Sequence, residues 1–461
     1  MTHVILGSCC KDGACARVCP QNCIHPLPGE DGFDSADSLY IDPESCIDCT
    51  ACVEACPASA IKPARSLSPD HPYLAFNREF YAQVPPPPRG RLSATFQLPL
   101  GIPHDKLKVA IVGAGPAAMY TVRELLNRST SIHVTVYELH DAVGGLLQRG
   151  VSLNNPGVRK MSRLFDLPFH DDRVTTILNT EVGRDISINE LRTEYDAVIL
   201  ACGASQPRQV GRDLCGNGIY QALDILVGEN DPASVSSPSA LTGPVCIVVG
   251  AGNVAFDIVR WVAENRHQAS KNSQVRELLV LSRSAPESAA FTRSAFYELL
   301  DLADADILID SDGDLPGAES ALLCELSQLP STVFCGMHTL PTDTTGPLRI
   351  ILSFGQEVAE LAQEGSSAVA VTTIKGRIFH ANSTICATGF TTKWINGVPL
   401  NEHGFVPNRS GQVVSPETGE PLIGLYVVGW AKRGASGGVG ENRACAAETV
   451  AQLVADRHSR V

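Results

Sequence analysis

Cysteines concentrate at the start of the chain, and their spacing constrains this region more than any other feature of the sequence. Nine of the sixteen cysteines fall within the first 56 residues. One complete run has the frame C-x2-C-x2-C-x3-C-P and comprises Cys46, Cys49, Cys52, Cys56 and Pro57. An earlier run has the same frame with one substitution and comprises Cys9, Asp12, Cys15, Cys19 and Pro20. Two such runs in tandem are typical of a segment that holds two iron–sulfur clusters.

The two runs are expected to exchange one ligand, because in such tandem frames the fourth cysteine of each run ligates the other cluster. Cluster II, a [4Fe-4S] cluster, is therefore expected on Cys19, Cys46, Cys49 and Cys52. Cluster I is expected on Cys9, Cys15 and Cys56, with Asp12 where its fourth ligand would stand. A carboxylate is a harder and weaker ligand for this iron than a thiolate. Cluster I is then either a [3Fe-4S] cluster or a [4Fe-4S] cluster with Asp12 or water on the labile iron.

Two further cysteines lie close to these runs. Cys10 is adjacent to Cys9 and could replace it as a ligand if the loop is reshaped, whereas Cys23 is expected to be a packed free thiol. A zinc site is the alternative for any four cysteines, because thiolates also bind zinc. The x2-x2-x3-Pro frame occurs twice here, and this repetition favours iron–sulfur clusters over zinc.

The rest of the composition is that of a soluble globular protein of two to four domains, since 461 residues exceed one ordinary core. We find no run of 18 or more apolar residues and no basic-then-apolar start. A membrane span and a signal peptide are therefore not expected. Clustered thiols without a secretory signal indicate a reducing compartment, and we expect a cytoplasmic protein.

The chain is acidic, with a formal net charge of −14, of which residues 1–66 contribute −5 through nine acidic against four basic side chains. No basic run or RNA-binding aromatic motif occurs, which argues against a nucleic-acid partner. An acidic redox module usually docks on a basic surface, although the charge could equally serve solubility alone.

Composition changes twice beyond the cysteine module of residues 1–66. Residues 67–105 are predicted to be a semi-rigid Pro-rich linker, because the four consecutive prolines Pro85 to Pro88 favour polyproline II. From residue 106 onward, apolar strand runs alternate with helical patterns. This alternation predicts an α/β fold with two Rossmann-like doubly wound sheets behind a small α+β module.

Two β-α-β units carry this prediction. The first has strands at 108–112 and 133–137, joined by a glycine turn and a helix that passes Leu126. The second has strands at 245–249 and 278–281 around a helix through Trp261. Beyond the two cysteine runs and these two units we find no repeat.

Each unit begins with a glycine turn of the dinucleotide-binding type. Gly113 permits the tight turn, and Gly115 lets the backbone approach a pyrophosphate at the helix N-terminus. Glu138 follows Gly113 by 25 residues, where an acidic side chain can hydrogen-bond a ribose diol. Arg283 stands at the corresponding place in the second unit and could pair with a 2′-phosphate. The first unit is therefore interpreted as an FAD site and the second as an NADP site.

From about residue 106 to the end, the sequence resembles the adrenodoxin-reductase type of ferredoxin–NADP reductase. The resemblance rests on residues 112–117, 137–138, 145–146, 181–185, 250–257, 387–389 and 429–434. With the cysteine module in front, the whole chain is similar to the fused ferredoxin/ferredoxin–NADP reductases of mycobacteria and relatives. The start, from Ser8 through Pro26, is especially similar.

The resemblance implies contacts to both nucleotides. For FAD it implies contacts at Ala117, Glu138, Leu146, Val182, Trp430, Gly437, Gly438 and Val439, beside Gly113 and Gly115. For NADP(H) it implies contacts at Arg208, Ala251, Gly252, Asn253, Val254, Arg283 and Gly437. It also implies a discontinuous FAD-binding domain at 106–206 and 385–461, an NADP-binding domain at 207–384 between its halves, and a last helix at about 443–454.

The chain departs from this family at several positions. The family has two arginines for the 2′-phosphate, and Ser284 here replaces the second, so NADP preference is expected to be weaker although serine can still donate to phosphate. Asn155 replaces a histidine near the flavin, and Ala295 replaces a glutamate. Hydride transfer needs no general acid or base, so these losses do not exclude activity, and no catalytic side chain is assigned.

The resulting hypothesis is a ferredoxin–NADP reductase, in which NADPH gives a hydride to FAD and single electrons pass through the fused ferredoxin. The cofactors carry the chemistry, and the protein supplies binding and orientation. The external acceptor is expected to be a cytochrome P450 or a separate ferredoxin, and the protein is expected to be a monomer. Two alternatives stay open: an electron-input subunit resembling the small subunit of glutamate synthase, and a non-catalytic nucleotide-binding redox sensor, which the losses at Asn155 and Ala295 favour.

Overall fold

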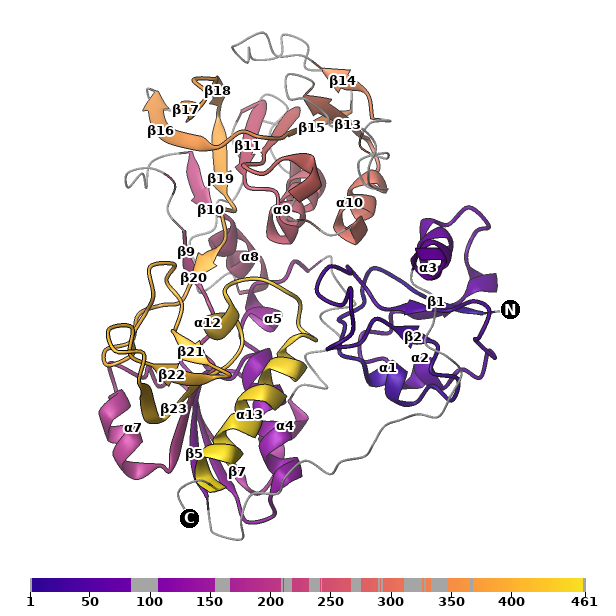
Figure 1. Cartoon of the computed structure of the whole chain (residues 1–461). Helices are drawn as coiled ribbons and strands as arrows, with labels where there is room; N and C mark the ends of the chain where they lie inside the picture. The colour runs from indigo at the N-terminus through magenta and orange to yellow at the C-terminus, as the bar shows by residue number, and fades with distance from the viewer. Residues whose placement is uncertain are drawn as a thin grey trace. The chain divides into compact units, whose positions relative to one another are not determined.

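The chain forms two compact units (Figure 1). The first comprises Met1–Gln148, Asn155–Gln206 and Phe390–Val461, and the second comprises Arg149–Asn154 and Pro207–Gly389. The computed structural model describes residues 2–83, 107–153, 166–208, 210, 218–231, 241, 243–266, 275–288, 291, 293–310, 326, 329–332, 347–364 and 368–458. Pro85 to Pro88 and Asn155, on which two of the sequence predictions fall, lie outside the described residues.

The cysteine module at the start of the first unit is a small α+β fold of short elements. Strand β1 pairs antiparallel with β4, and β2 pairs antiparallel with β3. The bounds are β1 His3–Ile5, α1 Ala14–Arg17, β2 Ile24–His25, β3 Tyr40–Ile41, α2 Ala51–Ala55 and β4 Ile61–Pro63. The residues before the two helices, Gly13 and Thr50, both have left-handed backbones, with φ of 68° and 65°. The two cysteine runs therefore build the same local turn twice.

A helix follows the module where the sequence predicted the start of the linker. Helix α3 spans Pro72–Gln83 and packs on the module. The Asn77 Oδ1 accepts the N–H of Ile41 at 2.7 Å, and the Tyr81 hydroxyl donates to the Cys23 carbonyl oxygen at 3.0 Å. The sequence predicts an extended chain from Pro85 to Pro88, which follow the helix. The helix itself begins at Pro72, and a proline is tolerated at a first helical position because its missing N–H is not needed there. The segment 72–83 is therefore helical and contacts the module, within the range 67–105 for which the sequence predicts a linker.

A seven-stranded sheet forms the rest of the first unit, in the order β21-β22-β23-β8-β5-β6-β7. Strands β23, β8, β5, β6 and β7 run parallel, whereas β21 and β22 add an antiparallel edge. The bounds are β5 Lys108–Val112, β6 His133–Tyr137, β7 Val174–Ile177, β8 Ala197–Leu200, β21 Asn408–Arg409, β22 Gln412–Val414 and β23 Pro421–Val427. The two middle strands, β8 and β5, have both faces covered, because successive strand residues point to opposite faces.

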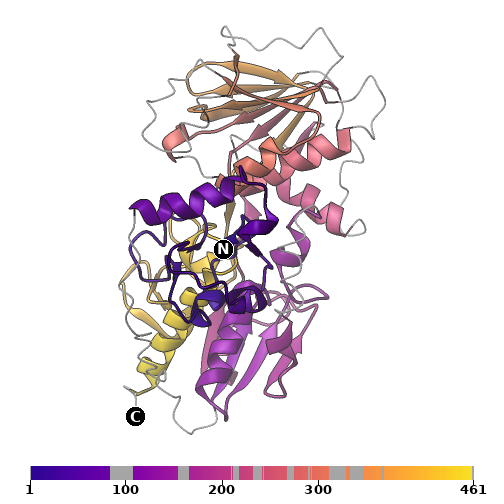
Figure 2. The same cartoon turned by 90° about the vertical axis from the view of Figure 1, so that its right-hand side faces the viewer.

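Helices cover this sheet on both faces. Helices α4 (Pro116–Arg128) and α13 (Asn442–His458) lie side by side and pack on one face against residues such as Ile111 (Figures 1 and 2). Helix α7 (Ile188–Glu194) packs on the other face against residues such as Val112. The first residue of α4, Pro116, directly follows the glycine turn, so the sheet and its helices place that turn at the carboxyl edge of β5.

The second unit contains a seven-stranded parallel sheet in the order β10-β19-β11-β12-β15-β13-β14. The bounds are β10 Ile219–Gln221, β11 Val245–Val249, β12 Glu277–Leu281, β13 Ala305–Asp310, β14 Ser331–Thr332, β15 Leu348–Ser353 and β19 Ser383–Cys386. One face packs on helices α8 Ala222–Asn230, α9 Asn253–Asn265 and α10 Arg293–Leu300. The other face packs on an antiparallel meander of β16 Val358–Glu364, β17 Ala368–Thr373 and β18 Ile378–Ala381.

The predicted fold class, two Rossmann-like units behind a small α+β module, is confirmed. The strands expected at 108–112, 133–137 and 245–249 are β5, β6 and β11 with the same bounds. The strand expected at 278–281 is β12, which begins one residue earlier. Continuous apolar runs marked these strands because parallel strands are buried on both faces.

Candidate cofactor sites

The four cysteines expected to hold cluster II border one pocket. Cys46, Cys49 and Cys52 of the second run line it together with Cys19 of the first run. Cys19 and Cys52 are buried, Cys46 is half-buried and Cys49 is exposed. The fold therefore brings the fourth cysteine of one run to the first three of the other, which is the exchange that the tandem frame predicts.

Cys23 lies in the same pocket, beside the expected ligands. Its side chain is buried, and its Sγ lies 3.3 Å from the Sγ of Cys19. Hydrogen bonding from this thiol is the largest cause that lowers the pKa of Cys19 to about 6 and that of Cys46 to about 5. The sequence predicted only a packed free thiol at Cys23, and the signal for more was its position four residues after a ligand. The Cys23 N–H donates to the Cys19 Sγ at 3.5 Å, and either of the two neighbouring thiols can donate to the other.

The residues expected for cluster I form a second group. Burial is the largest cause that raises the pKa of the Cys15 thiol, and the charges of Cys9, Cys56 and Asp12 raise it further, so these four side chains lie near one another. The Lys11 N–H donates to the Cys9 Sγ at 3.4 Å. Cys56 of the second run therefore lies near Cys9 and Cys15 of the first run, as the exchange of ligands requires.

The carboxylate of Asp12 is held by the protein on both oxygens. Its Oδ1 accepts the N–H of Ala14 at 2.9 Å, and its Oδ2 lies 3.6 Å from Nη1 of Arg443. The Asp12 side chain is only 8% exposed. These two contacts hold the Asp12 carboxylate in place within the protein.

Both groups have the donors that iron–sulfur clusters need. Thiolates are soft ligands that suit such iron, and N–H donors to sulfur are usual around these clusters. Among the residues that the structure describes, no three His, Cys, Asp or Glu side chains converge closely enough to hold a single metal ion. Cys19, Cys46, Cys49 and Cys52 border one pocket, so these four thiols fit a cluster of several iron atoms.

The first glycine turn is tightly packed. The φ of Gly113 is 98°, and a Cβ on this residue would lie 2.7 Å from the Ala201 carbonyl oxygen. The turn therefore requires glycine at this position, and it leads directly into the N-terminus of helix α4 at Gly115. Helix N-termini present free N–H groups and a positive partial charge, which suit a pyrophosphate.

Glu138 closes the mouth of this turn at the end of β6. Its carboxylate is buried, and its Oε2 accepts the Ala114 N–H at 2.7 Å while its Oε1 accepts the His140 N–H at 3.0 Å. Two fixed backbone donors hold the side chain beside the turn. This arrangement fits a ribose diol, so the residues present fit a dinucleotide.

The C-terminal residues implied for FAD lie next to the same turn. The Trp430 Nε1 donates to the Gly437 carbonyl oxygen at 3.3 Å, and Trp430 stacks on Phe390 with ring centroids 6.5 Å apart. A Cβ on Gly429 would lie 2.5 Å from the Cβ of Ala117, so this segment passes close over the start of α4. Ala117, Trp430 and Gly437 therefore belong to one region.

The remaining residues implied for FAD belong to the same unit. Leu146 begins the short helix α5 (Leu146–Arg149) and is half-buried, and Val182 is buried. Gly438 is exposed, and its N–H donates to the Glu441 Oε1 at 3.3 Å. Val439 is half-buried and packs against the same core as the start of α4.

The second glycine turn repeats the first. The φ of Gly250 is 113°, and a Cβ there would lie 2.3 Å from the Ala387 carbonyl oxygen. Gly252 caps helix α9, and a Cβ on it would meet no atom within 4 Å. Ala251 is buried, whereas Asn253 at the helix start is exposed. The open space at the N-terminus of α9 fits the phosphates of a second dinucleotide.

The side chains implied for the 2′-phosphate follow strand β12. Arg283 is exposed, and Ser284 is half-buried with its carbonyl oxygen accepting the Ser282 hydroxyl at 3.0 Å. Val254, one residue into α9, is half-buried. Arg208 is exposed, and its N–H donates to the Gly389 carbonyl oxygen at 3.0 Å within the second unit.

Ala295 lies in the hydrophobic core of the second unit. It is 7% exposed and belongs to the core that contains Phe256, Phe291 and Phe296. Phe256 and Phe291 stack with centroids 4.6 Å apart. An alanine suits this apolar surrounding. Asn155, the other substituted position, lies outside the described residues.

Sequence comparisons agree with this architecture. Residues 8–60 match the 4Fe-4S dicluster domain family, and residues 111–179 match the NAD(P)-binding Rossmann-like domain family. Two Rossmann-like units behind a dicluster module define a nucleotide-dependent oxidoreductase with its own iron–sulfur domain.

Full-length relatives specify the family. The chain is 35% identical over 493 residues to the "Probable ferredoxin/ferredoxin--NADP reductase" of Mycobacterium tuberculosis, covering 99% of this chain and 84% of that protein. It is 33% identical over 490 residues to the protein of the same name from Mycobacterium leprae, covering 99% and 86%. The chain belongs to the ferredoxin/ferredoxin–NADP reductase family, and the predicted resemblance is confirmed.

A solved structure supports the fold. The Mycobacterium tuberculosis FprA complex with NADPH matches with a TM-score of 0.63 and 24% identity, covering 77% of this chain and 85% of that one. Across the parts of the chain that the structure describes, no helix is both long and apolar enough to cross a membrane.

Proposed function

We propose that this chain oxidises NADPH at an FAD site in its first unit and delivers the electrons singly through its own two iron–sulfur clusters. The observation that carries the proposal is the pair of glycine turns in one chain, one closed by the carboxylate of Glu138 and the other followed by the cation of Arg283. A carboxylate suits a free ribose diol, and a guanidinium suits a 2′-phosphate. The names of the full-length relatives favour this reductase over an electron-input subunit or a redox sensor.

The protein residues bind and orient the cofactors. We assign FAD binding to residues 106–206 and 385–461 and NADP binding to residues 207–384. When bound, FAD accepts the hydride of NADPH and passes its electrons on one at a time, because each cluster accepts a single electron. Glu138 orients the ribose, Trp430 closes the flavin side of the first unit, and Gly252 leaves room for the nicotinamide dinucleotide phosphates.

The clusters are proposed to differ in iron content. Cys19, Cys46, Cys49 and Cys52 supply four thiolates and would hold a [4Fe-4S] cluster. Cys9, Cys15 and Cys56 supply three, and the engagement of both Asp12 oxygens by Ala14 and Arg443 supports a [3Fe-4S] cluster there. The acceptor beyond cluster II is proposed to be a one-electron protein such as a cytochrome P450 or a separate ferredoxin.

Anaerobic addition of NADPH to the pure holoprotein tests the proposal. The FAD absorbance is expected to bleach, and the EPR signals of both clusters are expected to change. Protein that contains flavin but neither iron nor acid-labile sulfide, or a flavin that NADPH leaves oxidised, would contradict it.

Arg283 offers a sharper test of cofactor choice. Replacing it in Arg283→Ala removes the cation that would face the 2′-phosphate, and the KM for NADPH is expected to rise about tenfold, or ~1.4 kcal/mol, while that for NADH stays unchanged. Arg409, another exposed arginine, lies in the first unit, so Arg409→Ala is the matched control and should alter neither KM. Equal effects of Arg283→Ala on both nucleotides would exclude a role in 2′-phosphate recognition.

A further inference from the structure

The loop that carries cluster I lies directly on the start of helix α13. A Cβ on Gly440 would lie 1.7 Å from the Cys10 carbonyl oxygen and 2.4 Å from the Asp12 nitrogen. Gly440 is buried, so the two backbones touch where a larger residue would force them apart. Sequence reasoning missed this glycine, because no motif includes it and its partner lies at the other end of the chain.

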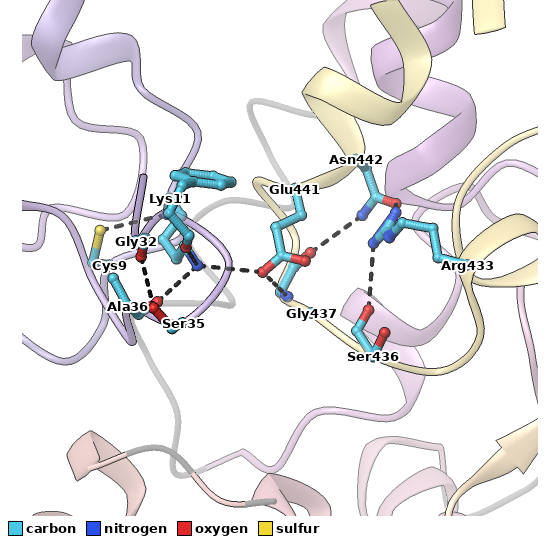
Figure 3. A network of polar contacts seen from close by, with 12 residues as sticks. Cys9, Lys11, Gly32, Ser35, Ala36, Arg433, Ser436, Gly437, Glu441 and Asn442 are labelled. Carbon is cyan, nitrogen blue, oxygen red and sulfur yellow. Dashed lines mark hydrogen bonds and ion pairs between the residues drawn. The ribbon is translucent and has the colours of Figure 1, made fainter. Parts of the chain in front are cut away.

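Two cationic side chains, Arg443 and Lys11, also connect the cluster I loop to helix α13 and the residue before it. The Arg443 Nη1 donates to the Asp12 carbonyl oxygen at 2.8 Å and lies 3.6 Å from its carboxylate. The Lys11 Nζ lies 3.6 Å from the Glu441 Oε1, and Figure 3 shows these two side chains pointing toward each other. The Lys11 side chain is 9% exposed and that of Arg443 is 20% exposed, so water screens both pairs weakly.

We name this surface the docking contact and define it by Cys10, Lys11 and Asp12 on the module and by Gly440, Glu441 and Arg443 at the start of helix α13, all within the first unit. At Gly440 the backbone lies so close to the cluster I loop that only glycine fits. Two ion pairs add to this contact, and the module supplies the cation in one (Lys11) and the anion in the other (Asp12). Such complementarity fixes orientation as well as contact.

The docking contact lies beside the first glycine turn. Glu441, which faces Lys11, also accepts the N–H of Gly438. Asn442 lies next to Gly429, whose backbone passes over Ala117 at the start of α4. These contacts join the cluster I loop to the N-terminus of the helix at the carboxyl edge of the sheet, where open α/β sheets bind dinucleotides.

Tyr120, one turn further along α4, supports this placement. Its side chain is fully buried in the same core that receives Cys10. Cys9 and Cys10 pack against this core, so the cluster I loop lies close to the body of α4.

The opposite cysteine run has a different surrounding. Cys49 is exposed, and Ile47 beside it is 57% exposed. The docking contact includes residues next to Cys9 and none of the residues that border the cluster II pocket. One cluster site therefore adjoins the FAD site, and the other adjoins solvent.

We propose that cluster I is the first acceptor of electrons from FAD, that the docking contact holds it there, and that cluster II receives electrons only from cluster I. This inference rests on the proposed function. With the clusters bound, the first electron of the reduced flavin would pass through cluster I to cluster II, and the second would then remain on cluster I, because each cluster takes a single electron. After both transfers the proton of the reduced flavin has gone to solvent, so the step balances with NADPH as the sole reductant.

Rapid-freeze EPR of the unmodified holoprotein tests the order. After anaerobic mixing with NADPH, the signal of cluster I is expected to change before that of cluster II. A parallel arm reduces the flavin photochemically, so that the order is measured even if NADPH does not reduce the flavin. If the signal of cluster II changes first in either arm, the inference is wrong. If NADPH does not reduce the flavin but photochemical reduction gives the expected order, only the proposed function is contradicted.

Substitutions test the docking contact. In Arg443→Gln, loss of a charge-assisted hydrogen bond is expected to shift docking by about tenfold and to slow the flavin-to-cluster step equally. Bleaching of the flavin by NADPH and the FAD content are expected to stay unchanged. The matched control is Arg457→Gln, at the far end of the same helix, where the side chain pairs with Asp196 at 3.2 Å.

Gly440→Val provides an independent variant, because its side chain would collide with the Cys10 carbonyl group. It is expected to slow the same step at least as much as Arg443→Gln, with both clusters still assembled by iron and sulfide analysis. If both variants pass electrons from flavin to cluster I as fast as the unmodified protein, the docking contact does not hold the first acceptor.

Discussion

The two cysteine runs share one frame but lie in different surroundings. Each begins its short helix after a left-handed residue, Gly13 in one run and Thr50 in the other. The group of the first run is covered by the docking contact, where Arg443 pairs with Asp12. The group of the second run opens toward solvent at Cys49.

The comparison indicates that the spacing of the cysteines determines which of them can bind a cluster. The residues packed around each cysteine run then determine which cluster lies near the flavin. Short cysteine spacings let one loop wrap a cluster wherever the loop lies. Which cluster meets the flavin depends on what packs against the loop, and here that is Gly440 and Arg443. Potentials respond to the same surroundings, because hydrogen bonds to sulfur and nearby charges set them.

The largest expected effect comes from removing one proposed ligand from each cluster in turn. Cys15→Ala removes a thiolate from cluster I, and Cys52→Ala removes one from cluster II. Because cluster I is the first acceptor, Cys15→Ala is expected to abolish reduction of cluster II and of cytochrome c by NADPH. Cys52→Ala is expected to abolish cytochrome c reduction while cluster I still becomes reduced. Stopped-flow absorbance and EPR measure both.

The flavin provides the control for both variants, since NADPH should bleach it at the normal rate in each. Iron and sulfide analysis shows which cluster has been lost. Reduction of cluster II in Cys15→Ala would show that the two clusters receive electrons independently.

The next effect concerns Asp12, the position at which the first cysteine run differs from the second. Asp12→Cys restores a fourth thiolate to cluster I, and the hydrogen bond from Arg443 to the backbone of residue 12 can remain. The iron content per flavin is expected to rise, and the EPR signal of an oxidised three-iron cluster is expected to disappear. Asp34→Cys, at an exposed position of the same module, is the control. Unchanged iron content would show that cluster I already has four iron atoms.

The smallest effect concerns Cys23, whose thiol lies against cluster II only. Cys23→Ala removes a donor to the cluster sulfurs, so the more negative reduced cluster loses stabilisation and its potential is expected to fall. A net hydrogen bond of ~1 kcal/mol corresponds to about 40 mV for a one-electron couple. EPR-monitored redox titration measures the shift.

Cys246→Ala, the same substitution at a buried site in the second unit, is the control for this titration. It should leave both potentials unchanged. A shift of the cluster I potential in Cys23→Ala, with cluster II unaffected, would contradict the placement of this thiol.

Local patterns account for much of what could be predicted. Strands β5 and β11 were predicted from apolar runs and β6 as the second strand of its β-α-β unit, and the ends of β6 and β12 located Glu138 and Arg283. Helix α3 escaped prediction because nearby prolines outweighed its weak pattern, and its stability comes from packing on the module through contacts such as that of Asn77 with Ile41. Cys23 escaped because it falls outside both cysteine frames, and only the fold shows its Sγ 3.3 Å from that of Cys19.

The sequence by itself predicted the ligand sets, the two glycine turns and the order of the domains, because each depends on residues close together in the chain. Only the tertiary structure decided that the loop between Cys9 and Cys15 packs against the start of helix α13. That relation depends on a backbone contact between Cys10 and Gly440 and a hydrogen bond between Asp12 and Arg443. No local period or spacing encodes the approach of such distant residues, because it arises from how complete surfaces pack.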